Sequence, residues 1–166
     1  FVAPPDGDAE MFSAATGRQG RYPNYPPYGA GSMAAHLRAD GVECLILNLN
    51  AVVLKACREV PSEDDFDCRR TVHAALLEAI EDFAPDLIGV TCMFSQTHRS
   101  AVDVCHLVKS LAPDLPLAIG GVHVTNSMMD ANTRERLLDG FAMADLIFLY
   151  ECEIALRDFL RVIDSR

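Results

Sequence analysis

The sequence lacks the long apolar runs that a membrane span requires, and it contains few positive charges. Its longest apolar stretches, such as Leu45–Leu47 and Leu146–Tyr150, are far shorter than the roughly 20 residues needed to cross a bilayer. No basic segment followed by an apolar one begins the chain, so we expect no signal peptide in it. Its 14 basic and 24 acidic residues give a formal net charge of −10. That charge disfavours binding to nucleic acid and to an anionic membrane surface, because both need Lys and Arg.

Several catalytic and ligand-binding motifs are also missing. The sequence has no GxSxG, no P-loop GxxxxGK[ST], no complete GxGxxG and no HxxxH or HExxH pair. No two of its six cysteines lie within three residues of each other, which excludes a CxxC redox centre and a zinc knuckle. We therefore expect free thiols in a reducing compartment, a cytoplasmic location, and no metal site built from the protein alone.

Short apolar runs rich in Val, Ile and Leu alternate along the chain with longer stretches of helical period. The runs are nearly continuous, which is typical of strands buried on both faces of a parallel sheet. The predicted strands are Phe1–Ala3, Val42–Leu49, Leu87–Met93, Leu115–Ile119 and Leu146–Tyr150. The predicted helices are Tyr28–Asp40, Phe66–Phe83, Thr97–Leu111, Asn132–Phe141 and Ile154–Ile163. Right-handed crossovers then predict an α/β fold, a doubly wound, flavodoxin-like sheet of five parallel strands with helices on both faces.

The length of the chain and its long connections predict how it is organised. Its 166 residues fit one domain, and we expect a single domain over residues 1–166 whose first strand is clipped. Pro4–Pro27 and Asn50–Asp65 are long for connections, and we expect both to be functional or mobile loops. Each follows a predicted strand at the carboxyl edge of the sheet, where open α/β sheets bind ligands.

Three segments that follow predicted strands carry candidate ligand-binding residues. The pair Gly120-Gly121 has no Cβ atoms, so either a bulky ligand packs against its backbone or the pair simply forms a tight turn. Thr91 and Ser95 can donate hydrogen bonds to a ligand at the point where the strand order reverses, although Ser95 can instead cap the next helix. Glu151 and Glu153 fall near the start of the last helix, whose dipole favours negative charge even without a ligand.

Four segments occur in an order that is informative as a set. Pro26–Gly41 begins PPYG and ends MAAHLRADG, Pro85–Thr91 reads PDLIGVT, Ile119–Thr125 reads IGGVHVT, and Ala144–Leu156 reads ADLIFLYECEIAL. In that order they are similar to the family patterns PPLG…LAA.LR..G, PD.VGIS, GGPHAT and D.VV.GEGE…L. The chain therefore resembles the cobalamin-binding domain of cobalamin-dependent radical S-adenosylmethionine enzymes.

The resemblance implies a flavodoxin-like fold that holds cobalamin at the carboxyl edge of the sheet. The corrin ring would lie over the loops and the nucleotide tail beside the sheet. In this picture Thr91 and Ser95 contact the tail, while Gly120 and Gly121 make room for it. The full set of cofactor-binding residues that it implies is Thr91, Met93, Ser95, Gly120, Gly121, Val122, His123, Tyr150, Glu151 and Glu153. It implies no catalytic residue and no metal ligand in this chain.

The sequence departs from the family pattern at three points. It has no DxHxxG after the first strand, which is usual in the radical branch and argues against the methionine synthase and mutase branches. Tyr150 and Cys152 replace the glycines of GEGE. The CxxxCxxC that would hold an iron–sulfur cluster is absent, so a 4Fe-4S cluster and S-adenosylmethionine are expected only in a radical domain downstream of Arg166.

The resulting hypothesis is a cobalamin-binding module, not catalytic alone, that presents cobalamin to a neighbouring radical domain for methyl transfer or related radical chemistry. One alternative is a cobalamin-free scaffolding or partner-recognition domain of the same fold, which the altered GEGE turn motivates. Another is a flavin-binding or receiver-type signalling domain. Asp6 and Asp8 lie near the acidic position of a receiver, but the last lysine, Lys109, falls within a predicted helix. Residues 4–20 are only a faint match to a flavin phosphate loop.

Overall fold

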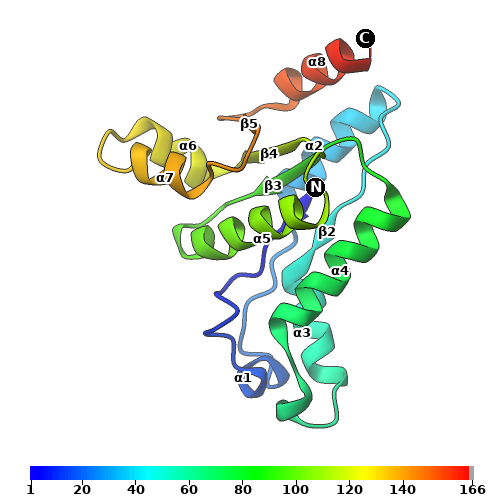
Figure 1. Ribbon diagram of the computed structural model, residues 1–166, viewed down its shortest axis with the longest axis vertical. Coiled ribbons are helices and arrows are strands. Elements are labelled where there is room, and N and C mark those ends of the chain that lie inside the picture. Colours follow the sequence, from blue (N-terminus) through cyan, green and yellow to red (C-terminus); the bar gives the residue numbers. More distant parts are fainter. Residues whose placement is uncertain (165–166) are drawn as a thin grey trace.

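The computed structural model describes residues 1–164 and, among their side chains, those up to Val162. It contains a five-stranded sheet in the order β2-β1-β3-β4-β5, in which every neighbouring pair is parallel (Figure 1). The strands are β1 (Val2–Ala3), β2 (Leu47–Asn48), β3 (Ile88–Thr91), β4 (Leu117–Gly120) and β5 (Leu146–Ile147). The strand order reverses at β1, so the topological switch point lies between β1 and β3. The predicted flavodoxin-like α/β fold is confirmed.

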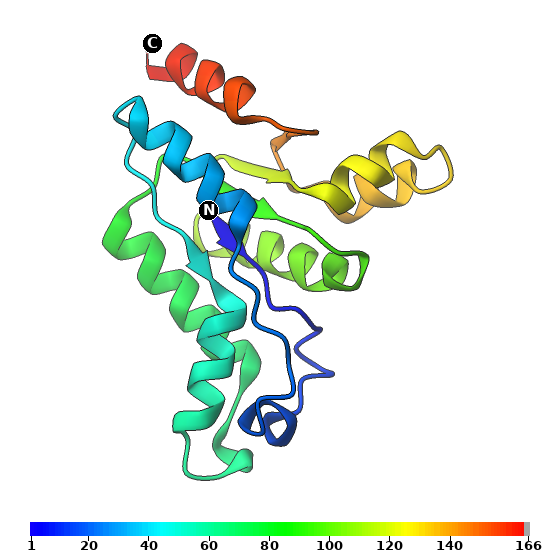
Figure 2. The same ribbon diagram turned by 180° about the vertical axis from the view of Figure 1, so that it is seen from behind.

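Helices cover both faces of this sheet. Figure 1 shows α4 and α5 in front of it, and Figure 2, from behind, shows α2 against the other face. The helices are α1 (Ala14–Arg18), α2 (Tyr28–Ala39), α3 (Leu49–Glu59), α4 (Cys68–Phe83), α5 (His98–Leu111), α6 (Val122–Met129), α7 (Arg134–Gly140) and α8 (Glu153–Asp164), with short 3-10 turns at Glu63–Asp65 and Ser95–Thr97. Within the described residues, none of these helices is both long enough and apolar enough to cross a bilayer.

The core lies between the central strands and the helices, as the periodicity predicts. On α5, Ala101, Val104 and Val108 are almost fully buried at helical spacing, against Leu117 and Ile119 of β4. The five helices predicted from the sequence correspond to α2, α4, α5, α7 and α8, and their ends agree within two residues. The side chain of Ile163, which the periodicity of the last helix includes, lies outside the described ones.

The prediction for residues 42–65 was partly wrong. The strand predicted over Val42–Leu49 pairs only at Leu47–Asn48, and the segment predicted as a loop over Asn50–Asp65 contains the helix α3. The Asn48 side chain caps this helix by accepting a hydrogen bond from the Ala51 N–H at 3.1 Å. Leu49, Val53 and Cys57 then form a buried face at a spacing of four residues. Because Leu49 continues the apolar run of the strand, it concealed the start of the helix.

Asp145 joins β4 and β5 at the end of the sheet opposite the candidate site. One of its oxygens, Oδ2, accepts a hydrogen bond from the Leu117 N–H at 2.8 Å and another from Lys109 Nζ at 2.7 Å. These two bonds, with the Lys109 bond the larger effect, hold the pKa of Asp145 below its usual range. The contact fixes where the edge strand β5 begins.

Candidate functional site

A cavity of about 270 Å³ opens at the topological switch point. Its walls come from the carboxyl ends of β1 and β3, from the start of α3, and from the segment that enters α2. The residues that line it are Ala3, Pro4, Asp6, Tyr25, Pro26, Pro27, Tyr28, Gly29, Ala30, Asn48, Asn50, Thr91, Met93, Phe94 and Thr97. Two predicted site residues, Thr91 and Met93, therefore lie in this wall. The position is the one at which open α/β sheets bind ligands.

The first long loop, residues 4–27, is held beside this cavity by buried polar side chains. Asn50 is 6% exposed, and its Nδ2 donates to Asp6 Oδ2 at 3.1 Å and to the Pro23 carbonyl at 2.9 Å. Its Oδ1 accepts from the Asp6 N–H at 3.1 Å. Ser100, also buried, donates to the Pro5 carbonyl at 2.6 Å. The loop predicted from sequence thus has a fixed conformation where it borders the cavity, and it contains the short helix α1.

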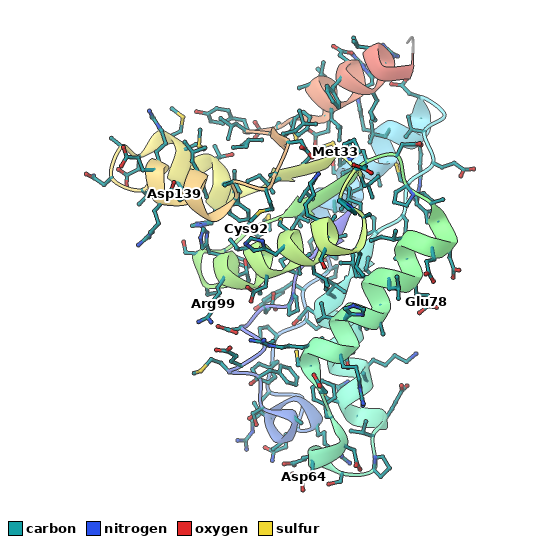
Figure 3. All side chains as sticks on the ribbon, in the orientation of Figure 1. Met33, Asp64, Glu78, Cys92, Arg99 and Asp139 are labelled. Carbon is teal, nitrogen blue, oxygen red and sulfur yellow. The ribbon has the colours of Figure 1, made fainter. Side chains whose placement is uncertain are left out.

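Farther along the same loop, ion pairs connect it to α4 and α5. Arg99, which Figure 3 labels at the start of α5, pairs with Asp8 at 3.0 Å and with Glu10 at 3.3 Å. Arg69 of α4 pairs with Glu10 at 2.6 Å. These side chains are largely exposed apart from that of Asp8, so each pair contributes only a small part of the stability.

Two further predicted residues, Ser95 and His123, meet between the ends of β3 and β4. Ser95 Oγ lies 3.1 Å from His123 Nδ1, and His123 Nε2 lies 3.0 Å from Nδ1 of His98, the first residue of α5. Burial lowers the pKa of both histidines, and the neighbouring His123 and Arg136 lower that of His98 further. Both rings are therefore neutral near pH 7, and one ring donates a hydrogen bond to the other.

The alternative prediction that Ser95 caps the following helix was wrong. Thr97, which precedes α5, makes no side-chain cap bond, and neither does Phe94 before the 3-10 turn. The side chain of Ser95 instead contacts His123, which is 28 residues away in the sequence. Sequence reasoning did not include His98 in the site, because a single histidine at a helix start carries no pairing signal.

The glycine pair lies against the protein's own backbone. Gly121 has a φ of 109°, and a Cβ placed on it would lie 2.5 Å from the Cys92 carbonyl oxygen. A Cβ on Gly120 would lie 3.2 Å from the Phe148 carbonyl oxygen. Neither glycine lines the cavity. The turn interpretation of this pair therefore has a direct structural basis, and the turn leads into α6, a helix that the sequence analysis did not predict.

The last three predicted residues follow β5, which is shorter than the predicted strand Leu146–Tyr150. Tyr150 has a φ of 58°, and its N–H donates to Thr125 Oγ1 of α6 at 3.0 Å. Glu151 is exposed, and Glu153 begins α8, where its Oε1 accepts from Ser32 Oγ of α2 at 3.4 Å. The left-handed backbone at Tyr150 coincides with one of the two positions where the family pattern has glycine.

Large apolar side chains are exposed after three of the strands. Met93 and Phe94 follow β3, Val122 follows β4, and Tyr150 follows β5, with exposed fractions of 40%, 46%, 53% and 63%. All four follow the carboxyl ends of strands and therefore lie at the same edge of the sheet as the cavity. In the described part of the chain, no group of three or more His, Cys, Asp or Glu side chains is arranged to hold a metal ion.

Comparisons with known proteins found one family match and one similar curated protein. Residues 20–143 match the family model of the B12 binding domain. Over 97 residues the chain is 28% identical to cytidylyl-2-hydroxyethylphosphonate methyltransferase of Streptomyces wedmorensis. That alignment covers 58% of this chain and 18% of the relative, so the chain matches only a small part of a much longer protein. No solved structure matches the chain significantly.

Proposed function

We propose, because this chain belongs to the B12-binding domain family, that it carries cobalamin for a radical S-adenosylmethionine methyltransferase. The family match shows a cobalamin-binding domain. The radical partner and the methyl transfer are the proposed part. The order of the four sequence motifs supports them, and so does a relative named as a methyltransferase.

The observation that carries the proposal is the cavity at the switch point. Its volume of about 270 Å³ is just below the range of roughly 300–1,000 Å³ that is typical for drug-sized ligands. It therefore accommodates part of cobalamin, and the remainder lies outside over the exposed Met93, Phe94, Val122 and Tyr150. A Cβ atom added to Gly29, at the start of α2, would meet nothing within 4 Å, so this side of the cavity is open.

Within this proposal the ten predicted residues lie at different positions relative to the cavity. Thr91 and Met93 contact the part of the cofactor inside the cavity, while Ser95 and His123 contact it next to the end of β3. Val122, Tyr150, Glu151 and Glu153 lie at the outer edge, and Gly120 and Gly121 shape the turn between β4 and α6. When bound, cobalamin supplies a reactive cobalt, and this chain supplies binding and orientation. No residue here is proposed as a general acid or base.

Gel filtration with hydroxocobalamin tests the cofactor part of the proposal. After removal of free cofactor, we expect close to one equivalent to co-elute with the protein and to show a base-off visible spectrum. Gly29→Trp should abolish retention, because the indole would occupy the cavity that Gly29 lines. The open space around Gly29 lets the larger side chain fit without disturbing the fold. Gly31→Trp, on the same helix but outside the cavity, is the matched control and should retain cobalamin. A substitution at Gly121 is unsuitable, because it would distort the backbone beside Cys92.

Failure of the wild-type protein to retain cobalamin would favour the scaffolding alternative. The radical partner has a separate test in the coding sequence that follows the codon for Arg166. A CxxxCxxC motif there is expected, since it would hold the 4Fe-4S cluster that cleaves S-adenosylmethionine. A stop codon at that point would contradict the enzyme assignment and would favour a stand-alone cobalamin binder.

A further inference from the structure

The cavity at the switch point contains one carboxylate, that of Asp6, just beyond the carboxyl end of β1. No Lys, Arg or His side chain lines this cavity. Much of the surrounding wall is apolar and includes Pro4, Pro27 and Phe94. Burial accordingly raises the pKa of Asp6. A carboxylate in such a wall is costly to desolvate unless a hydrogen-bond donor meets it.

Asn50 fixes the position of this carboxylate from both sides. The Asn50 Nδ2 donates to Asp6 Oδ2 at 3.1 Å, and the Asp6 N–H donates to Asn50 Oδ1 at 3.1 Å. Asn50 also holds the Pro23 carbonyl, so the carboxylate cannot swing away without disturbing both ends of the first loop. The other oxygen, Asp6 Oδ1, accepts no hydrogen bond from any residue that the structure describes. That oxygen is available to a ligand.

The chemistry of the cavity indicates which donor this oxygen accepts. No cationic side chain in the wall is available to pair with the phosphate of a nucleotide, so that phosphate would lie outside the cavity. A neutral hydroxyl beside a flat ring fits it, because Tyr25, Tyr28 and Phe94 supply aromatic surface and Asp6 supplies the acceptor. Carboxylates at the ends of strands in doubly wound sheets bind the hydroxyls of ribose in the same way.

We propose that Asp6, held by Asn50, is a specificity-determining residue that accepts a hydrogen bond from a sugar hydroxyl of the nucleotide tail of bound cobalamin. This inference rests on the proposed function, and it adds the residue that recognises the sugar of the tail. It predicts that the protein distinguishes cobalamin from cobinamide, which has the corrin ring but no nucleotide.

The decisive variant is Asp6→Asn. Its side-chain oxygen can still accept the hydrogen bond from Asn50, while its NH₂ group replaces the free acceptor in the cavity with a donor. Asp8→Asn is the control, because Asp8 lies two residues further on and pairs with Arg99 outside the cavity. Dissociation constants are measured by visible-spectrum titration with hydroxocobalamin and with cobinamide, and unfolding midpoints are measured for each variant.

We expect Asp6→Asn to weaken cobalamin binding about tenfold, because the neutral amide replaces a charged acceptor and the charge-assisted hydrogen bond to the sugar hydroxyl is lost. Cobinamide binding should change by less than about twofold, because cobinamide has no nucleotide sugar to contact Asp6. Asp8→Asn should change neither. Because the readout is the ratio of the two constants, a general loss of folded protein does not mimic the result. Asp6→Glu, which keeps the charge but displaces the oxygens, should show the same selective loss.

Two results would overturn the inference without contradicting the proposal that the wild-type protein binds cobalamin. In the first, Asp6→Asn binds cobalamin as tightly as the wild type. In the second, Asp6→Asn weakens cobalamin and cobinamide equally, which would place Asp6 against the corrin ring. A wild-type protein that binds no cobalamin would instead overturn the proposed function, and this inference with it.

Discussion

At the scale of single residues, Tyr150 holds a backbone conformation that its own side chain makes unfavourable. Its φ of 58° is left-handed, and this region costs a residue with a Cβ roughly 1–2 kcal/mol. The side chain is 63% exposed, so little packing would be lost on its removal. A glycine would avoid this cost but would itself lower the stability by about 0.5–1 kcal/mol, because it has more conformational freedom in the unfolded chain.

We therefore expect Tyr150→Gly to increase the free energy of unfolding by roughly 0.5–1 kcal/mol. Urea denaturation measures the change. Ala84→Gly should behave alike, because Ala84 ends α4 with a φ of 46°. Glu151→Gly, at the neighbouring position, is the control and should not stabilise the protein. A loss of stability in Tyr150→Gly would mean that the tyrosine ring makes contacts that outweigh the backbone cost.

The paired histidines predict how stability depends on pH. The pKa values of His98 and His123 are lowered in the folded protein, so the unfolded chain takes up protons at higher pH than the folded one. Stability from these groups is thus complete above the ordinary histidine value of about 6.5 and is lost as the pH falls below it. We expect a decrease in unfolding free energy between neutral and mildly acidic pH.

The variant His98→Asn separates this effect from other titrations. Asparagine can place a polar atom near the position of Nδ1 and keep a bond to His123, but it does not titrate. The pH dependence of urea unfolding should therefore be shallower than in the wild type. His106→Asn, exposed on the same helix, should keep the wild-type slope. Identical slopes in all three proteins would exclude the pair as the source of the pH dependence.

At the scale of elements, Asp145 sets how the edge strand β5 joins the sheet. Asp145→Asn weakens its bonds to Lys109 Nζ and the Leu117 N–H, and we expect a loss of about 1 kcal/mol near neutral pH, because the group is largely exposed. The Asp145 pKa is lowered, so this contribution is present above the usual aspartate pKa and disappears as the pH falls through the folded value. Urea denaturation at neutral and strongly acidic pH measures both effects. Asp114→Asn, in the adjacent turn, should have little effect at either pH.

The same scale explains which elements the sequence could predict. The central strands are continuous apolar runs and five helices show a clear period, so both are visible locally. The helix α3 is hidden because its apolar face continues the run of β2 through Leu49. The helix α6 starts directly after Gly121, so its residues were interpreted as a ligand loop. At β2 and β5 the strands predicted from the sequence are longer than those in the structure. The length of a paired strand there depends on neighbours far away in the chain, which a local pattern does not show.

Prediction of the site from the sequence was limited in the same way. Thr91 and Met93 were predicted because they follow a strand, and the structure places both in the cavity wall. Asp6 and Asn50 were not assigned to the site, because 44 residues separate the two and only the folded loop brings them together. His98 was likewise missed, since its partner His123 is 25 residues away. Whether these residues touch the cofactor stays a prediction.

At the scale of the whole molecule, binding of the cofactor and folding are linked. A ligand that binds only the folded state stabilises it by about 2.7 kcal/mol at a concentration 100 times its Kd. Hydroxocobalamin should therefore raise the unfolding midpoint of the wild type and of Gly31→Trp. It should leave that of Gly29→Trp unchanged. Equal shifts in both variants would show that the cofactor binds elsewhere on the surface.

The six cysteines of the molecule determine how it can be labelled with thiol reagents. All are free, and desolvation raises the pKa of each thiol, to about 11 for Cys68 and about 12 for Cys105. Since thiolates are the species that react with maleimides, the native cysteines are slow targets near pH 7. A cysteine introduced in place of Tyr25, which is 65% exposed at the cavity wall, would be labelled first. A fluorophore attached there would signal the arrival of a coloured cofactor by quenching, with every native cysteine still in place.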